Sequence, residues 1–172
     1  MNRGAQIAIT GVLVTASTLA LWRDLEGGAL LMPYQDIAGV WTVCAGHTGP
    51  DVIPGVAWTQ SQCNAKDWQN LNYYARVVVR CTDNAPLTRG QRDALTVFAG
   101  NVGEGAFCSS TLAREIRAGN YAVDGQFPRW VYHSCRTSGG CQFSQGIFNR
   151  RMKELARFHA PGMPSVYDAS GT

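Results

Sequence analysis

The most constraining feature of this sequence is an uncharged stretch over residues 4–22, directly before the first cluster of charged residues. Arg3 precedes the stretch, and Arg23, Asp24 and Glu26 follow it. As a helix, its 19 residues would extend ~28 Å, close to the ~30 Å hydrocarbon thickness of a bilayer. About half of these residues are Gly, Ala, Ser or Thr. We therefore expect insertion into a bilayer to be close to balanced.

Three interpretations of this stretch compete. A cleaved signal peptide has the same charged start and apolar middle, although Thr18 stands where a cleavage site after Ala20 prefers a small alanine. The stretch also suits a buried N-terminal helix of a soluble protein. The third interpretation is a marginal membrane segment that is able to leave the bilayer. The stretch alone does not decide between them.

The chain contains six cysteines spread along its length, namely Cys44, Cys63, Cys81, Cys108, Cys135 and Cys141. No two have the close C-x2-C spacing of zinc and redox motifs. An even, dispersed set favours disulfides in an oxidising compartment such as the periplasm, and buried thiols in a cytosolic protein are the alternative. The pairing stays open, but the short loop between Cys135 and Cys141 is predicted to close locally.

Length and composition indicate one domain with a core of its own. The chain has 172 residues, of which 45% are hydrophobic and 16% charged. Its net charge of +3 is too small for a nucleic-acid-binding footprint, so we expect no nucleic acid partner. The basic residues Arg150, Arg151 and Lys153 either add to a surface that suits an anionic partner or form a solvated helix face.

The chain after residue 23 predicts an α+β fold, with a small hairpin lobe followed by a mostly helical lobe. Short alternating apolar pieces between residues 26 and 54, punctuated by Gly and Pro, indicate antiparallel strands. Capping-box patterns at Thr59 and Thr88, and capping serines at 110 and 144, mark helix starts. Helices are predicted over 60–79, 88–99, 112–118, 121–133 and 145–159.

The densest polar chemistry lies between residues 26 and 49. Glu26 follows the uncharged stretch, Asp36 stands in a turn, and Thr42 stands in a short strand. One carboxylic acid that protonates a leaving oxygen, with a second carboxylate and a hydroxyl that hold water, suits carbohydrate hydrolysis. Taken alone, two carboxylates at this spacing are more often solvated surface groups or caps.

The segment PYQDIAGVWTVCAGHTG, residues 33–49, resembles the active-site hairpin of the phage-type lysozymes, glycoside hydrolase family 24. Supporting matches cover about residues 24–158 and comprise Asn101-Val102-Gly103, Ser110-Thr111-Leu112, Arg129-Trp130 and Gly146 with Asn149-Arg150-Arg151. The resemblance implies a lysozyme-like fold. It also implies an enzyme that cleaves the β-1,4 bond between N-acetylmuramic acid and N-acetylglucosamine in peptidoglycan. This enzyme is expected to be a monomer and to need no cofactor or metal.

The resemblance also implies residue roles. Glu26 matches the general acid, Asp36 the second carboxylate and Thr42 the hydroxyl that helps to position water. His47 matches a histidine that the family uses mainly for structure.

This sequence departs from the family pattern at two places. The Glu26–Asp36 spacing is one residue longer than usual, and Gly27 with Gly28 is expected to absorb the extra residue as a bulge or a longer loop. Gly100 stands where the family usually has an aromatic residue, which affects one wall of the sugar cleft.

A weakly apolar segment directly before the catalytic glutamate looks like that of the signal-arrest-release (SAR) endolysins. The resemblance implies a regulatory segment over residues 1–23 and a catalytic domain over 24–172. Residues 4–22 would hold the enzyme inactive at the periplasmic face of the host inner membrane until its release to the periplasm. The segment contains no cysteine, so we expect release without thiol exchange.

Two other function classes remain as alternatives. A thiol hydrolase would use Cys44 and His47, but residues three apart on a strand face opposite sides. A non-catalytic, membrane-tethered peptidoglycan-binding module would keep the cleft without needing Glu26.

Overall fold

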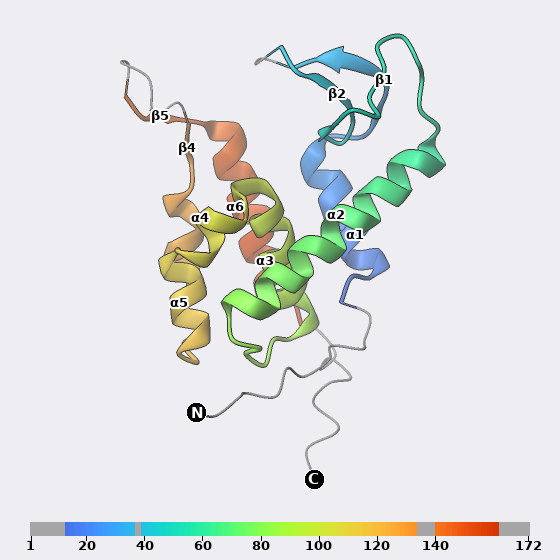
Figure 1. Cartoon of the computed structure of the whole chain (residues 1–172). Coiled ribbons are helices and arrows are strands. Elements are labelled where there is room, and N and C mark those ends of the chain that lie inside the picture. Colours follow the sequence, from blue (N-terminus) through green and yellow to red (C-terminus); the bar gives the residue numbers. More distant parts are fainter. Residues whose placement is uncertain (1–12, 37–38, 134–139, 162–172) are drawn as a thin grey trace, which may run out of the picture.

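The computed structural model describes residues 13–36, 39–133 and 140–161. A three-stranded sheet and a two-stranded hairpin lie at the same end of a helical body, on opposite sides of it (Figure 1). The helices are α1 (Ala16–Glu26), α2 (Gln60–Cys81), α3 (Arg89–Val102), α4 (Glu104–Cys108), α5 (Thr111–Arg117) and α6 (Gln145–His159), with a 3-10 helix η1 (Asp124–Arg129). The strands are β1 (Leu30–Gln35), β2 (Trp41–Cys44), β3 (His47–Thr48), β4 (Tyr132–His133) and β5 (Gln142–Phe143). The α+β prediction is confirmed.

The small lobe is an antiparallel sheet in the order β1-β2-β3. Tyr34 pairs with Thr42, but the register shifts between Leu30 and Tyr34. Gly27 caps α1 in the left-handed conformation at φ 73°, and Gly28 also has a positive φ of 99°. Residues with a side chain rarely adopt these angles, so the two glycines make the turn from α1 into β1, and a bulged β1 takes up the length that follows.

The helical lobe is built around α3, whose residues 93–99 are all buried. The capping boxes at Thr59 and Thr88 are present, and the side chains of Ser110 and Ser144 accept the expected backbone N–H bonds. The predicted helix over 121–133 is wrong in part, because only residues 124–129 are helical and residues 132–133 form β4. Pro128 has no N–H to donate, which limits this segment to a short 3-10 turn.

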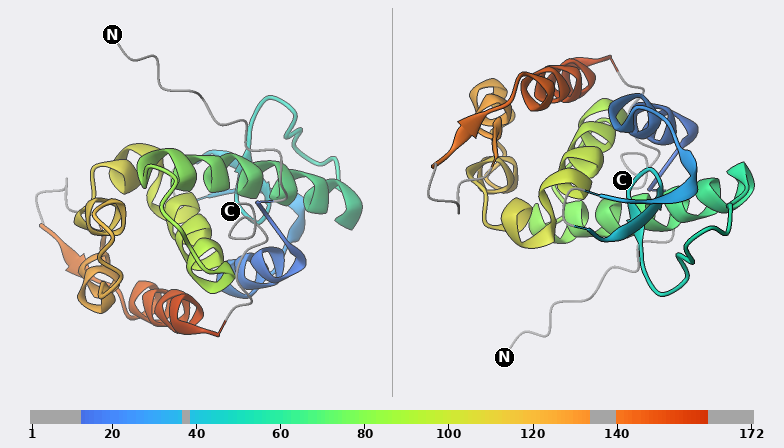
Figure 2. Two further views of the ribbon diagram at one scale, coloured as in Figure 1. Left: turned by 90° about the horizontal axis from the view of Figure 1, so that it is seen from below. Right: turned by 90° about the horizontal axis from the view of Figure 1, so that it is seen from above.

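Helix α1 packs into the body of the protein rather than standing apart from it (Figure 2). Leu13, Val14, Leu19 and Trp22 are buried in a cluster with residues of α2 and α3. Ser17, Asp24 and Glu26 bond to three basic residues of α6, namely Arg157, Lys153 and Arg150. Within the described residues, no helix is both long and apolar enough to cross a membrane.

Two disulfides join distant elements. Cys44–Cys63 connects β2 to the first turns of α2, and Cys81–Cys108 connects the end of α2 to the end of α4. Cys141 is also disulfide-bonded, but Cys135 lies outside the described residues, and with it the predicted Cys135–Cys141 pair. Disulfide use itself is confirmed.

Candidate active site

Glu26 is the last residue of α1 and stands where the helical body passes into the small sheet. Its Oε1 accepts a hydrogen bond from Arg150 Nη1 at 2.7 Å. The side chain of Glu26 is 22% exposed and that of Arg150 11%. A carboxylate in this setting is accessible to a ligand while its orientation is fixed by a charge-assisted bond.

Arg150 belongs to a chain of polar contacts that runs through the interior. Its Nε donates to Glu154 Oε1 at 3.2 Å, and Glu154 also pairs with Arg151, which bonds to Asn101 of α3. Burial raises the pKa of Glu154 and lowers that of Arg151, while the charges of the pair oppose both shifts. The orientation of Glu26 therefore depends on how α6 packs against α3.

This arrangement corrects the interpretation of the basic stretch on α6. Arg151 is only 1% exposed, and Arg150 bonds internally, so neither forms part of a solvated basic face. Lys153 does lie at the surface, where it pairs with Asp24 at 2.8 Å. Sequence reasoning missed Arg150 as the partner of Glu26, and the only available signal was its place in the Asn149-Arg150-Arg151 match.

Asp36 and Thr42 are brought together by the β1–β2 hairpin. The backbone N–H of Val40 donates to Asp36 Oδ1 at 3.0 Å, and the hydroxyl of Thr42 donates to the carbonyl of Val40, also at 3.0 Å. Thr42 is 3% exposed. The hydroxyl of Thr42 donates its proton to the Val40 carbonyl, so the lone pairs of the hydroxyl oxygen can accept a hydrogen bond from water. Residues 37–38, at the tip of this turn, lie outside the described residues.

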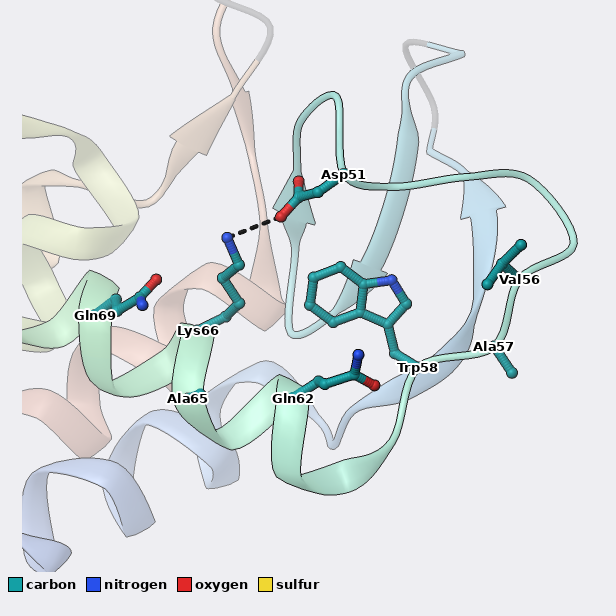
Figure 3. Close-up of a pocket in the computed structure, with 8 residues that line it drawn as sticks. All are labelled: Asp51, Val56, Ala57, Trp58, Gln62, Ala65, Lys66 and Gln69. Atoms are coloured by element: carbon teal, nitrogen blue, oxygen red, sulfur yellow. Dashed lines mark ion pairs between the residues drawn. The ribbon is translucent and has the colours of Figure 1, made fainter.

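His47 has two neighbours that fix its ring. Its Nε2 lies 2.9 Å from Asp51 Oδ1, and its ring centroid lies 5.3 Å from that of Trp58. Lys66 pairs with the other oxygen of Asp51 at 2.8 Å (Figure 3). The bond from Lys66, and then that from His47, lower the pKa of Asp51 to about 2. Cys44 is bonded to Cys63 and has no thiol, so the thiol hydrolase alternative is wrong.

Gly100 is explained by Trp22. A Cβ atom at residue 100 would lie 2.8 Å from Cζ3 of the buried Trp22 indole, closer than real side chains approach. The Arg150 guanidinium in turn lies 5.8 Å from the centroid of the Trp22 ring. An aromatic side chain from α1 therefore packs directly against Gly100 and against the partner of Glu26.

A family model described as phage lysozyme matches residues 24–154. The chain belongs to the phage lysozyme family and is a glycoside hydrolase of the muramidase type. Membership in this enzyme family favours a catalytic protein over the alternative of a non-catalytic peptidoglycan-binding module.

The similar proteins point to the same class. The SAR-endolysin of Enterobacteria phage PA-2 is 38% identical over 157 residues, which cover 86% of this chain and 84% of that protein. The endolysin from Escherichia coli O157:H7 phage FAHEc1 aligns with a TM-score of 0.75 and 25% identity over 90% of this chain and 98% of that one. The muramidase domain of SpmX from Asticaccaulis excentricus aligns with a TM-score of 0.78 and 24% identity, covering 86% and 98% of the two chains.

Proposed function

We propose that Glu26, Asp36 and Thr42 hydrolyse the β-1,4 bond between N-acetylmuramic acid and N-acetylglucosamine in peptidoglycan, and that this activity lyses the host cell. The observation that carries the proposal is the Glu26–Arg150 pair. Arg150 Nη1 lies 2.7 Å from Glu26 Oε1 and holds this partly exposed carboxyl group at the junction of the two lobes. The hairpin that carries Asp36 and Thr42 begins four residues further along the chain.

Each of the three residues has a distinct role. Glu26 protonates the oxygen of the departing sugar. Asp36, with the acceptor lone pairs of Thr42, holds the water or stabilises the cationic sugar on the opposite face. His47 supports the hairpin through Asp51 and takes no part in proton transfer. The family name and the lysozyme-like fold support this assignment.

The test replaces Glu26 with Gln, which keeps the shape of the side chain but removes its proton. Turbidity loss of outer-membrane-permeabilised Gram-negative cells should fall by at least ~100-fold, with an unchanged melting temperature. The matched control is Asp24→Asn on the same helix, which removes an exposed carboxylate and should keep full activity. Retained activity in Glu26→Gln overturns the proposal.

We also propose that residues 1–23 are a SAR segment that holds the enzyme inactive at the inner membrane and later releases it to the periplasm. Several relatives carry the name SAR-endolysin. Residues 13–22 pack within the fold and lead directly into Glu26. Residues 13–22 cannot pack within the fold and lie in a bilayer at once. The membrane-bound state therefore lacks the Glu26–Arg150 contact and is inactive.

The polar residues of the segment support its role in release. Ser17 Oγ donates to Asp93 Oδ2 at 2.7 Å, and Thr18 Oγ1 donates to Asp93 Oδ1 at 2.6 Å. Asp93 is 1% exposed and also pairs with Arg157. The side chains that weaken membrane insertion are thus the ones that satisfy a buried carboxylate after release.

Release is tested by making the segment more apolar. With Gly11 and Ser17 both replaced by Leu, the enzyme should stay in the membrane fraction, and lysis after membrane depolarisation should be delayed or lost. The double variant with Ala at both positions removes the Ser17 bond while adding little hydrophobicity, and should still be released. Undiminished lysis by the Leu variant contradicts the proposal.

A further inference from the structure

A hollow lies between a loop of the small lobe and α2, outside the group formed by Glu26, Asp36 and Thr42. Its volume is about 400 Å³, within the range of small-molecule sites. It is bounded by the loop over residues 51–58 and by the first turns of α2 (Figure 3). The lining residues are Asp51, Val56, Ala57, Trp58, Gln62, Ala65, Lys66 and Gln69. None of them is a proposed catalytic residue.

The aromatic wall of this hollow is held in place. The backbone N–H of Trp58 donates to the carbonyl of Leu31 at 2.8 Å, and its indole packs against His47. Trp58 also rests on a buried cluster that contains the Cys44–Cys63 disulfide. The indole is therefore fixed before any ligand arrives, which lowers the entropic cost of binding.

The two charges in the hollow neutralise each other. Lys66 Nζ lies 2.8 Å from Asp51 Oδ2, above the indole in Figure 3. The bond from Lys66 lowers the pKa of Asp51 to about 2, so the Asp51 carboxylate is charged at neutral pH. A ligand with a net charge finds no unpaired opposite charge here, so the hollow favours an uncharged ligand.

Side-chain amides complete the lining. Gln62 Oε1 accepts from the N–H and the hydroxyl of Thr59, at 2.8 and 2.9 Å. Its amide nitrogen points toward the indole, and Gln69 adds a second amide (Figure 3). A fixed aromatic face beside amide donors and a neutral ion pair matches the apolar ring face and the hydroxyl and acetamido groups of a sugar.

We propose that this hollow is a second saccharide-binding site that takes an uncharged N-acetylhexosamine unit of a glycan strand. A second contact on the same small lobe keeps a cleaved polymer near the enzyme and raises its effective concentration at the catalytic residues. The choice of glycan rests on the proposed peptidoglycan substrate, whereas binding at Trp58 is measured independently of hydrolysis.

The binding test uses triacetylchitotriose as the probe and the Glu26→Gln variant as the protein, so that no hydrolysis interferes. The five tryptophan indole N–H signals are followed by NMR, and Trp58→Phe assigns the signal of Trp58. We expect a saturable shift of that signal. In an additional Ala65→Phe variant, which fills the hollow from an exposed helix position, binding should weaken by at least about tenfold.

The matched control is Arg76→Phe, an exposed position on the same face of α2 but outside the hollow. It should leave the Trp58 shift unchanged. With Glu26 intact, Ala65→Phe should lower turnover of insoluble sacculi several-fold and leave hydrolysis of short soluble oligosaccharides unchanged. No shift at Trp58, or an equal shift in Ala65→Phe, overturns the site. Loss of activity in Glu26→Gln with no shift at Trp58 overturns this site while supporting the proposed function.

Discussion

At the scale of single residues, the side chain of Arg150 bonds directly to the carboxylate of Glu26. Its guanidinium bonds to Glu26 and to Glu154 and lies over Trp22, so one side chain links the end of α1 to the core. Small displacements of a catalytic group cost large factors in rate. Replacing Arg150 with Met should lower kcat by ~10- to 100-fold and change KM little. Initial rates on permeabilised cells or on a soluble glycan measure both constants.

Lys153→Met is the matched control for Arg150, because it removes a cation from the same helix. Its ion pair with Asp24 has both side chains more than half exposed, and such pairs add little to stability. This variant should keep the wild-type kcat. Arg150→Lys should recover part of the loss of kcat, because it keeps a cation that can bond to Glu26. An unchanged kcat in Arg150→Met contradicts the positioning role.

Asp67 predicts a pH dependence of stability. Burial raises its pKa above the usual 3.8, and Arg23 Nε, at 3.9 Å, compensates only in part. The folded state therefore binds this proton more tightly than the unfolded chain, and the contribution to stability falls as the pH rises above about 4. Asp67→Asn should raise the melting temperature at pH 7 by about 2 °C or more, with the gain vanishing near pH 3.

Asp24→Asn serves as the comparison for Asp67→Asn, because Asp24 is exposed. Thermal melts from pH 3 to pH 8 should show a growing difference for Asp67→Asn and a flat one for Asp24→Asn. A melting temperature of Asp67→Asn below that of the wild type at pH 7 would show that the ion pair with Arg23 outweighs burial.

Among the elements, those whose signals are local were predicted well from the sequence. The pairs Thr59/Gln62 and Thr88/Gln91 start α2 and α3, because a capping box is satisfied within four residues. The small lobe was predicted from short alternating strands and glycines. The Gly27–Gly28 turn is also in place, because a positive φ is a property of the backbone at that point.

What escaped prediction depends on contacts between elements far apart in the sequence. Ile147, Phe148, Met152, Leu155 and Phe158 are spaced as the apolar side of a helix, yet only Phe158 of α6 is buried among them. Arg151 and Glu154 are buried instead, because each neutralises the other.

The same limit applies to α2 and to the disulfides. On α2, Ala65 is exposed while Asp67 is buried. The sequence did not decide which cysteines pair, whereas the structure joins Cys44 to Cys63 and Cys81 to Cys108. The roles of Glu26, Asp36 and Thr42 remain predictions.

The two disulfides should differ in their effect on activity. Their loops span 19 and 27 residues. Loop-closure entropy assigns about 3 kcal/mol to each. Cys44–Cys63 ties the strand that carries Thr42 to α2, whereas Cys81–Cys108 lies within the helical lobe. Replacing Cys44 and Cys63 with Ala should lower both the melting temperature and kcat.

The control for that variant is the replacement of Cys81 and Cys108 with Ala. It should lower the melting temperature by a similar amount and leave kcat near the wild-type value below the transition. Thermal melts and initial rates at 25 °C separate the two effects. Equal losses of kcat in both variants would mean that the Cys44–Cys63 bond has no particular role in placing the hairpin.

For the whole molecule, the proposed release mechanism requires that the fold and the bilayer compete for the same N-terminal residues. Leu13, Val14, Leu19 and Trp22 are all less than 10% exposed, and burial of each contributes about 2 kcal/mol before entropic costs. A bilayer also removes these side chains from water, so hydrophobicity alone favours neither state. The polar contacts of Ser17 and Thr18 with Asp93 are available only in the fold, and we expect them to bias the equilibrium toward release.

This bias can be tested without changing the segment itself. Asp93→Ala removes the acceptor of both hydroxyls and leaves the hydropathy of residues 4–22 unchanged. Lysis after depolarisation should be delayed, and more enzyme should remain in the membrane fraction.

Ile116→Ala is the control for Asp93→Ala, because this fully buried residue of α5 lies outside the cluster around α1. Its loss costs ~2–5 kcal/mol. If Ile116→Ala delays lysis as much as Asp93→Ala, general destabilisation explains the delay. A longer delay in Asp93→Ala alone means that the hydrogen bonds of Ser17 and Thr18 to Asp93 favour the released state.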